Sequence, residues 1–420
     1  MGYRSGFEIW KGIAKGIVLV SLIIGCMYGA FFLFQKFDIT EDAQQPQTEY
    51  SETLYVKREN RLALENFIER HFIDDGFMRT NLVDSVQTDL ASGGDVLSES
   101  VGLLMLLYIE TDEPALFDQQ VQILKEHFLK ENQLLKWRIR PSESKEIANQ
   151  TNDRAGERRN ASDLVALDDN MMIVDDGTVN ATLDDLRIAR ALLLAADKWK
   201  HEQYGVFAQQ IAEQLLEYCV VDDQLRAFDD SASPAAPMVY YDFLTMEMLS
   251  PSNVRWNDII KANRSRIIES QINGYPFFDD PWFAANVSPS SESKGYPMIE
   301  NLMVFMHLSE IGEADRQALT WLQEQIRLGG IYANYGSDGK ALNSVESPAI
   351  YAIVSYIALL HQDEQLYRLV LEKLQTMQNM SQGDYYGGFV DLAQLSAYSF
   401  DQLTALLAYS REQDRRQLPN

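Results

Sequence analysis

The sequence contains very few of the residues that build metal centres, redox sites and disulfide frameworks. Among its 420 residues are only two cysteines, Cys26 and Cys219, and five histidines. Two cysteines cannot form a disulfide framework or a thiolate cluster, and no histidine pair has the HExxH spacing of a zinc site. A glycine-rich phosphate loop and a GxSxG nucleophile motif are also missing. We therefore expect no metal and no cofactor, and we interpret Cys219 as a buried thiol.

Positive charge is scarce as well. The chain has 36 Lys and Arg against 62 Asp and Glu, which gives a net charge of -26 at pH 7. Binding to nucleic acid depends on basic side chains that neutralise phosphates, and other anionic polymers make the same demand. The composition therefore argues against both as partners. The length allows a single large all-α domain.

A long uncharged run stands near the N-terminus. Residues Gly16 to Phe34 carry no charge, and as a helix they are long enough to cross the ~30 Å hydrocarbon layer of a membrane. Arg4, Lys11 and Lys15 precede the run and acids follow it, which places the N-terminus inside the cell. The sequence thus predicts a single-pass protein of the cell membrane. Its expected parts are a cytoplasmic N-terminus (1–15), a transmembrane anchor (16–37), a linker (38–50) and an extracellular domain (51–415).

Two other interpretations of this run stay open. One is a cleaved signal peptide, although no small-x-small cleavage site clearly follows the run. The other is lipidation, because Ile23-Ile24-Gly25-Cys26 looks like a bacterial lipoprotein processing box. The apolar run continues through Phe34, where a lipid-anchored protein would have a polar tether. An uncleaved anchor is therefore favoured.

Helical periodicity and breaks at Gly, Pro and Asn divide the remaining chain into about twelve helices. The expected ranges are 51–72, 97–110, 113–132, 182–200, 203–220, 239–250, 253–272, 297–311, 314–328, 346–361, 363–380 and 397–411. Many joints are only a few residues long, for example near Glu110 and His201, so neighbouring helices run antiparallel. Every even-numbered helix then begins at the same end of the molecule. Acids lie at these helix starts: Glu99, Asp184, Asp185, Asp242, Glu300, Glu346 and Asp401.

The segment Asn180 to Trp199 places two adjacent acids at the start of an almost wholly apolar helix. Thr182 is expected to cap this helix, and Asp184 and Asp185 fall in its first turn, where the helix dipole favours negative charge. A helix that is apolar nearly all round is buried, so these acids lie at one end of a core. That end is the predicted functional site.

The joints at the same end are rich in aromatic residues. They carry Trp137, Tyr240, Tyr241, Phe277, Phe278, Trp282, Phe283, Tyr332, Tyr335, Tyr385 and Tyr386. Sugar rings stack on flat aromatic faces and carboxylates act on glycosidic bonds, so the combination suits a carbohydrate site. Taken singly, each acid is explained as well by helix capping, and each tyrosine by sealing a core. Their shared end favours a functional role for two or three of the acids.

Two segments resemble glycoside hydrolase family 8, whose members are inverting enzymes on an (α/α)6 barrel. LSESVGLLML, around Glu99, resembles the family segment whose Glu is the general acid. ATLDDLRIARALLLAADKW resembles the family signature, and the matching residues are Ala181, Thr182, Asp185, Ile188, Ala189, Ala191, Ala195 and Trp199. Leu183 stands where the signature has its first Asp, which the family uses at the cleavage subsite. Either Asp184 takes over that role or binding of the sugar ring is altered.

Further segments resemble a membrane-anchored branch linked to bacterial exopolysaccharide, namely VYYDFL, GGIYANYG, VESPAIYA and YSFDQLTALLA. In that branch an Asp after paired aromatics looks like the base, which maps to Asp242, with Asp279 and Asp280 as runners-up. The resemblance implies that Glu99 protonates the leaving oxygen while Asp242 activates a water molecule. Substrate contacts are expected from Asp184, Asp185, Trp137, Tyr241, Asp280, Trp282, Tyr332, Tyr335 and Glu346.

The expected protein is a monomeric all-α (α/α)6 barrel that acts as an endo-glycosidase outside the cell. Its substrate is expected to be a β-linked neutral or amino-sugar polysaccharide, with β-1,4 the preferred linkage, and its partners include an exopolysaccharide synthesis machinery. The alternative is a glycan-binding or synthase-associated module that kept the barrel and lost turnover, which Leu183 favours. An α-solenoid scaffold is a third option, but the sequence has no repeat of fixed period.

Overall fold

Apolar periodicity organises the chain into helices joined by short connections. The computed structural model describes residues 55–83, 93–140, 179–282 and 295–414, and these contain twelve α-helices. The first helices are α2 (Arg58–His71), α3 (Ser98–Glu110), α4 (Pro114–Ile123), α6 (Thr182–Trp199), α7 (Glu202–Tyr218) and α8 (Phe243–Leu249). The others are α9 (Arg255–Glu269), α11 (Met298–Glu310), α12 (Gln317–Leu328), α13 (Pro348–Leu360), α14 (Glu364–Met377) and α15 (Ser399–Asp414).

Short two-residue strands accompany the turns between helices. They form four antiparallel pairs. Two are hairpins, β1 (Ile73–Asp74) with β2 (Phe77–Met78) and β5 (Val220–Val221) with β6 (Gln224–Leu225). The other two join strands that are separated by helices, β3 (Val96–Leu97) with β4 (Arg138–Ile139) and β7 (Tyr296–Pro297) with β8 (Asn334–Tyr335). A 3-10 turn, η2 (Met238–Tyr240), precedes α8, and a π-helical turn, η1 (Leu124–Phe128), follows α4. The described residues are therefore mainly helical.

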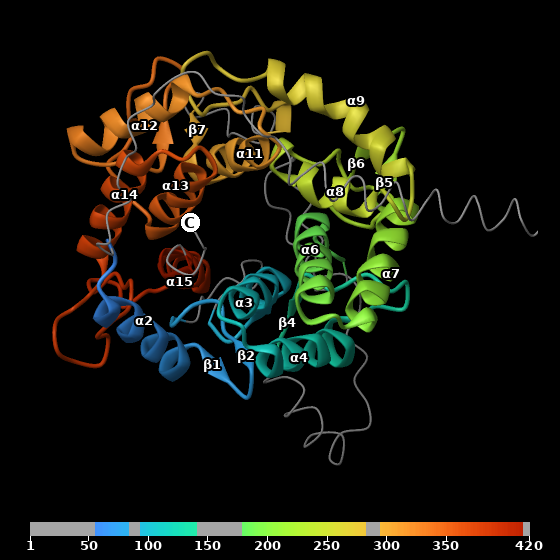
Figure 1. The fold of residues 1–420 in the computed structure, drawn as a ribbon, viewed down its shortest axis with the longest axis horizontal. Coiled ribbons are helices and arrows are strands. Elements are labelled where there is room, and N and C mark those ends of the chain that lie inside the picture. The colour runs from blue at the N-terminus through green and yellow to red at the C-terminus, as the bar shows by residue number, and fades with distance from the viewer. Residues whose placement is uncertain (1–54, 84–92, 141–178, 283–294, 415–420) are drawn as a thin grey trace, which may run out of the picture. The chain divides into compact units, whose positions relative to one another are not determined.

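Six helices form a closed inner ring (Figure 1). Going round it, α3 packs on α6, α6 on α8, α8 on α11, α11 on α13, α13 on α15, and α15 on α3. The alternate helices cover the ring from outside, with α4 on α3, α7 on α6, α9 on α8, α14 on α13 and α2 on α15. This arrangement is consistent with an (α/α)6 barrel.

The inner helices begin at one end of the barrel, as the alternation of helices predicts. Three hydrogen bonds join their first turns in pairs: Ser98 to Asp184 at 2.7 Å, Ser100 to Ser399 at 2.9 Å, and Ser347 to Asp401 at 2.6 Å. These bonds connect α3 with α6, α3 with α15, and α13 with α15. We call this end of the barrel the N-terminal end.

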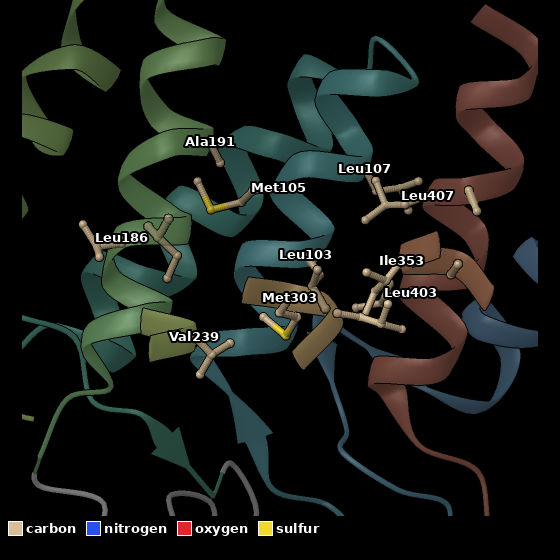
Figure 2. Packing of buried hydrophobic residues seen from close by; sticks show 14 of the residues in the cluster. Leu103, Met105, Leu107, Leu186, Ala191, Val239, Met303, Ile353, Leu403 and Leu407 are labelled. Carbon is tan, nitrogen blue, oxygen red and sulfur yellow. The ribbon is translucent and has the colours of Figure 1, made fainter. Parts of the chain in front are cut away.

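The middle of the ring is filled with apolar side chains. Leu103 of α3, Met303 of α11, Ile353 of α13 and Leu403 of α15 belong to one buried cluster, which Figure 2 shows from close by. Because these side chains come from helices on different sides of the ring, they close its interior. Polar side chains above them, toward the N-terminal end, therefore lie over an apolar floor.

The apolar helix predicted between Asn180 and Trp199 is α6, and it is buried along most of its length. Its start differs from the prediction. Thr182 does not cap α6, because it is the first residue inside the helix, is fully buried, and leaves Ala181 at the cap position. Asp184 and Asp185 do lie in the first turn, as predicted. Cys219 is a free buried thiol, also as predicted, and burial raises its pKa to about 12.

Several helices are shorter than predicted. The helix expected over 51–72 begins at Arg58, and the one expected over 113–132 ends its α-helical part at Ile123. The helix expected over 239–250 begins only at Phe243, because η2 occupies the preceding turn and the Asp242 side chain caps α8 by accepting a bond from the Thr245 amide.

The predicted membrane segment, 16–37, lies outside the described residues. Within the described parts of the chain, no helix combines the length and apolar character needed to cross a membrane.

Candidate active site

Two carboxyl groups meet where α3 and α6 begin. The Ser98 hydroxyl donates a hydrogen bond of 2.7 Å to Oδ2 of Asp184, and the backbone amide of Glu99 also donates to Asp184. Arg187, one turn further along α6, donates to Oδ1 of Asp184 at 2.8 Å. Asp184 is therefore held on both oxygens, directly beside the first turn of α3. The structure thus brings together Glu99 and Asp184, two of the residues predicted from the sequence.

Glu99 has the protonation behaviour of a general acid. The pKa of its half-buried carboxyl is raised to about 7, mainly by burial and also by the negative charge of Asp184, while Arg187 opposes the shift. Burial also raises the pKa of Asp184, but Arg187 and Ser98 favour its charged form. Glu99 consequently holds a proton near neutral pH while its own carboxyl makes no side-chain hydrogen bond to other described residues.

Two aromatic residues flank this pair. Ser98 donates its backbone amide to the carbonyl oxygen of Trp137 at 2.9 Å, so half-buried Trp137 lies against the start of α3. Tyr240, in η2, lies close enough to Asp184 and Glu99 for both charges to contribute to its raised pKa, although burial is the main cause. An aromatic surface next to carboxyl groups is a typical surrounding for a sugar ring.

Asp185, the neighbour of Asp184, has a different environment. Its side chain is 1 % exposed and accepts a bond of 2.7 Å from the Asn180 amide. Burial raises the pKa of Asp185 well above the usual range, and the bond from Asn180 opposes this shift. Asp185 therefore braces the segment that precedes α6, and the structure does not place it beside Glu99.

Asp242 lies in a separate network of buried charges. Arg190 of α6 donates to Asp242, and it also donates to both carboxylate oxygens of Glu310 at 2.6 and 2.8 Å. Thr245 donates its amide and its hydroxyl to Asp242 at 3.0 and 2.5 Å. His307 approaches Asp242 at 3.9 Å and Glu310 at 3.5 Å. The carboxylate of Asp242 is thus engaged on both oxygens.

The partners of Asp242 in this network lie further along their helices than Glu99 does in α3. Arg190 is eight residues beyond Thr182 in α6, which corresponds to about 12 Å of helix. Glu310 is the last residue of α11, at the opposite end from its start. Asp242 caps the start of α8, two residues after Tyr240, whose pKa is raised in part by the charges of Asp184 and Glu99. Its role as the base stays a sequence prediction.

Ligand-type atoms of Asp242, His307 and Glu310 all lie within 4.8 Å of one another, a spacing that would suit a metal ion. In this arrangement the Arg190 guanidinium already supplies the positive charge between the two carboxylates. Arg190 and His307 hold the pKa of Glu310 far below its usual range against the effect of burial. The cluster is explained as a charge-compensated brace between α6, α8 and α11.

The two runner-up acids lie in the loop after α9. Asp280 accepts bonds from the backbone amides of Met238 at 2.6 Å and Trp282 at 2.9 Å. Through Met238 it fixes η2, the turn that carries Tyr240. Asp279 is exposed and accepts a bond of 2.7 Å from the Tyr296 hydroxyl. Asp280 therefore positions a loop, whereas Asp279 is open to solvent.

Three of the predicted substrate contacts support loops from within. Tyr241 is buried and accepts a bond from the Leu225 amide at 3.2 Å, and buried Tyr335 accepts one from the Tyr332 amide at 2.9 Å. Glu346 accepts bonds from Tyr351 and from Lys373. Half-buried Tyr332 and Trp282 keep part of their rings open to solvent. The sequence prediction did not name Arg187 or Ser98, although Arg187 stands three residues after Asp184, a spacing that places both on one helix face.

Comparisons with known proteins agree with this arrangement of helices. No protein-family model matches the sequence. YdaJ of Bacillus subtilis (strain 168), whose name describes it as a candidate lipoprotein, is 24% identical over 348 residues, which cover 79% of this chain and 84% of YdaJ. A solved structure described as a novel alpha-amylase from Clostridium perfringens is 27% identical, with a TM-score of 0.68, and the match covers 86% of this chain and 99% of that one.

A family 8 xylanase gives a further match at the level of fold. The xylohexaose complex of a catalytic mutant of this enzyme from Teredinibacter turnerae superimposes with a TM-score of 0.56 over 84% of this chain and 93% of that chain, at 14% identity. At so low an identity the match concerns the arrangement of the helices alone.

Proposed function

From the fold that this chain shares with glycoside hydrolases of family 8, we propose that it hydrolyses glycosidic bonds, with Glu99 as the general acid. One observation carries the proposal. Glu99 is a half-buried carboxyl at the N-terminal end of the barrel, its pKa is raised to about 7, and no described side chain binds it. Such a group holds a proton at neutral pH and is free to deliver it.

The proton goes to the oxygen that links two sugar units. As the glycosidic bond breaks, this oxygen gains negative charge, and a proton from Glu99 neutralises it. Asp184 assists because its charge favours the protonated form of Glu99 before the reaction. Ser98 and Arg187 keep the Asp184 carboxylate in place. Trp137 and Tyr240 provide flat surfaces for the rings on either side.

The proposed reaction is a single displacement with inversion. It requires a second carboxylate that removes a proton from the attacking water, at about 6.5–9.5 Å from the acid. Asp242 is the base predicted from the sequence, with Asp279 and Asp280 as runners-up. NMR of the freshly released reducing end tests inversion, because a retained configuration at the anomeric carbon would exclude single displacement.

We propose a β-linked polysaccharide without negative charge as the substrate. A net charge of -26 disfavours anionic chains, and a chain of neutral or amino sugars avoids this repulsion. The Teredinibacter turnerae structure holds xylohexaose in a barrel of the same fold, which supports a β-glycan.

The match to the Clostridium perfringens structure favours an α-glucan as the second candidate, because that protein is described as an alpha-amylase and shares 27% identity with this chain. Hydrolysis of a β-glycan and hydrolysis of an α-glucan would both use Glu99 as the acid. Activity on a panel of polymers therefore decides between the two substrates.

We also propose that the chain acts outside the cell, attached to the membrane by its N-terminal segment. Two observations support this: the uncharged run from Gly16 to Phe34, and the name of YdaJ, which describes a lipoprotein. An extracellular glycosidase on the membrane would encounter exopolysaccharide as the polysaccharide is secreted. The competing function is a glycan-binding module on the same barrel, which the substitution of Leu183 in the family signature supports.

The test uses the full-length chain and a panel of polymers: β-1,4-glucan, mixed-linkage β-glucan, xylan, chitosan and amylose. We expect the wild type to release reducing ends from one of them, and we expect Glu99→Gln to reduce the rate by about 10²–10⁴-fold, the usual contribution of a general acid. Glu126→Gln, an exposed change on η1, serves as the control. Binding without any cleavage by the wild type would instead support the module.

A further inference from the structure

Besides Glu99, one acid at the N-terminal end of the barrel has no side-chain partner among the described residues. Glu300 lies in the first turn of α11, is half-buried, and its side chain forms no hydrogen bond or ion pair with other described side chains. The other acids at the inner helix starts are engaged: Asp184 with Ser98 and Arg187, Asp242 with Arg190, and Asp401 with Ser347. Burying a carboxylate without compensation costs stability, so such a residue calls for a functional explanation.

Glu300 belongs to the helix that stands opposite Glu99. In the ring, α3 and α11 are separated by α6 and α8 on one side and by α15 and α13 on the other. Helix α11 is therefore the third helix from α3 in either direction around the ring. Figure 1 shows α3 and α11 on opposite sides of the ring.

Glu99 and Glu300 each lie on the same helix face as a residue that fills the middle of the ring. Leu103 lies one turn after Glu99 in α3, and Met303 lies one turn after Glu300 in α11, so each acid shares a helix face with the apolar residue below it. Leu103 and Met303 belong to the buried cluster that fills the ring (Figure 2). Glu99 and Glu300 thus stand above the same apolar floor.

Helix geometry gives the expected separation of the two carboxyls. In a six-membered ring of helices packed about 10 Å apart, opposite axes lie about 20 Å apart. Two helix radii of about 2.3 Å and two glutamate side chains that each reach about 4 Å leave roughly 7 Å between the carboxyl groups. This is within the range of about 6.5–9.5 Å that leaves room for a sugar and an attacking water in an inverting glycosidase.

We propose that Glu300 is the catalytic base that deprotonates the attacking water, across the barrel from Glu99; this inference rests on the proposed glycosidase function. The water oxygen forms a bond to the anomeric carbon while the glycosidic C–O bond breaks. One proton passes from the water to Glu300, and one passes from Glu99 to the departing oxygen. The cycle ends with Glu300 protonated and Glu99 ionised, and exchange with solvent restores both.

The electrostatic surroundings of the two acids support this division of roles. Burial raises the pKa of both groups, but only Glu99 has a neighbouring carboxylate, Asp184, that raises it further. A hydrogen bond from its own backbone amide opposes the effect of burial on Glu300, whose pKa stays raised. The charge of Asp184 therefore favours the protonated form of Glu99 and has no counterpart at Glu300, which fits an acid at Glu99 and a base at Glu300.

The assignment also explains why Asp242 is placed as it is. A base must be free to accept a proton from water, whereas both oxygens of Asp242 are bound by Arg190 and Thr245. On this view Asp242 supports the barrel and Glu300 acts on the substrate.

Chemical rescue in the full-length chain tests the proposal. We expect Glu300→Gln to lower kcat by about 10²–10⁴-fold on the polymer that the wild type cleaves. Azide should restore activity to Glu300→Ala and yield a glycosyl azide, because the small anion attacks without needing a base. The control Glu324→Gln, on the exposed face of α12, should leave kcat unchanged. Equal thermal unfolding midpoints of the variants would show that the fold is intact.

The possible results distinguish a failure of the role of Glu300 from a failure of the glycosidase function. Wild-type activity together with unchanged kcat in Glu300→Gln would overturn the role of Glu300 and leave the glycosidase standing. Azide rescue of Asp242→Ala instead of Glu300→Ala would overturn it too and assign the base to Asp242. A wild type that cleaves no polymer in the panel would overturn the glycosidase function and the role of Glu300 with it.

Discussion

The hydroxyl of Ser98 donates a 2.7 Å hydrogen bond to the carboxylate of Asp184, and this bond fastens the first turn of α3 to the first turn of α6. It also sets the position of Glu99, the next residue in the chain, whose amide donates to the same carboxylate. The bond between Ser98 and Asp184 thus positions both Glu99, the acid, and Asp184, whose negative charge favours the protonated form of Glu99.

We predict that Ser98→Ala lowers both stability and activity. Asp184 loses one donor while it stays buried, which should cost about 1–3 kcal/mol in the free energy of unfolding. A looser Asp184 also stabilises the protonated Glu99 less well, so kcat/KM should fall by about tenfold, the equivalent of about 1.4 kcal/mol. Ser100→Ala breaks the neighbouring bond to Ser399 and should lower stability without changing kcat/KM. Equal activity in both variants would contradict the link between Ser98 and the acid.

Asp184→Asn should move the pH profile. The charge of Asp184 raises the pKa of Glu99, and Arg187 lowers it. Removing the negative charge leaves Arg187 without its partner, so the pKa of Glu99 falls. The alkaline limb of the kcat/KM profile, where the acid loses its proton, should then shift to lower pH. An alkaline limb in the same place as in the wild type would show that Glu99 and Asp184 do not interact.

Glu99 should make the stability of the protein depend on pH. Its pKa rises from 4.5 to about 7 on folding, so the folded state holds the proton more tightly than the unfolded state. This contribution is fully present below about pH 4.5 and is lost as pH rises toward 7, by an amount on the order of 2–3 kcal/mol. Glu99→Gln should remove this dependence. Denaturant unfolding at pH 5 and pH 8 measures it, and equal slopes in wild type and variant would count against a buried, protonated Glu99.

Arg190→Met should destabilise the barrel strongly. It leaves Asp242 and Glu310 buried without a positive partner, and breaking a buried ion pair in this way costs about 3–5 kcal/mol. Lys340→Met, which breaks an exposed pair with Asp338, should cause no measurable change. Thermal and urea unfolding of the two variants provide the comparison. Similar stability in both would mean that the buried network does not hold α6, α8 and α11 together.

The sequence was sufficient to predict the helices, their alternation and the shared end of the inner six. These features depend on local periodicity and on short joints, both of which are visible in the chain. The same reasoning placed Glu99 and Asp184 in the first turns of inner helices, but it did not predict that the two lie next to each other.

The roles of the other acids depend on partners that are distant in the chain. Asp242 is bound by Arg190, 52 residues away, and Arg190 reaches a further 120 residues to Glu310. No local pattern indicates these contacts, so an acid at a helix start looks the same whether it is free, like Glu300, or engaged, like Asp242. Because Asp242 caps α8, this helix begins at Phe243 and not at the predicted residue 239. An Asp at the cap position followed by Thr245 is a local signal that can be recognised in a sequence.

The most direct test of the account is the activity of Glu99→Gln on two substrates that differ in their need for an acid. A glycosyl fluoride of the sugar in the cleaved polymer has a leaving group that departs without a proton, whereas the polymer's glycosidic oxygen requires one. We predict that Glu99→Gln hydrolyses the polymer about 10²–10⁴-fold more slowly than the wild type. Its rate of hydrolysis of the fluoride should stay close to that of the wild type. Equal loss on both substrates, or no loss on the polymer, would contradict the assignment of Glu99 as the general acid.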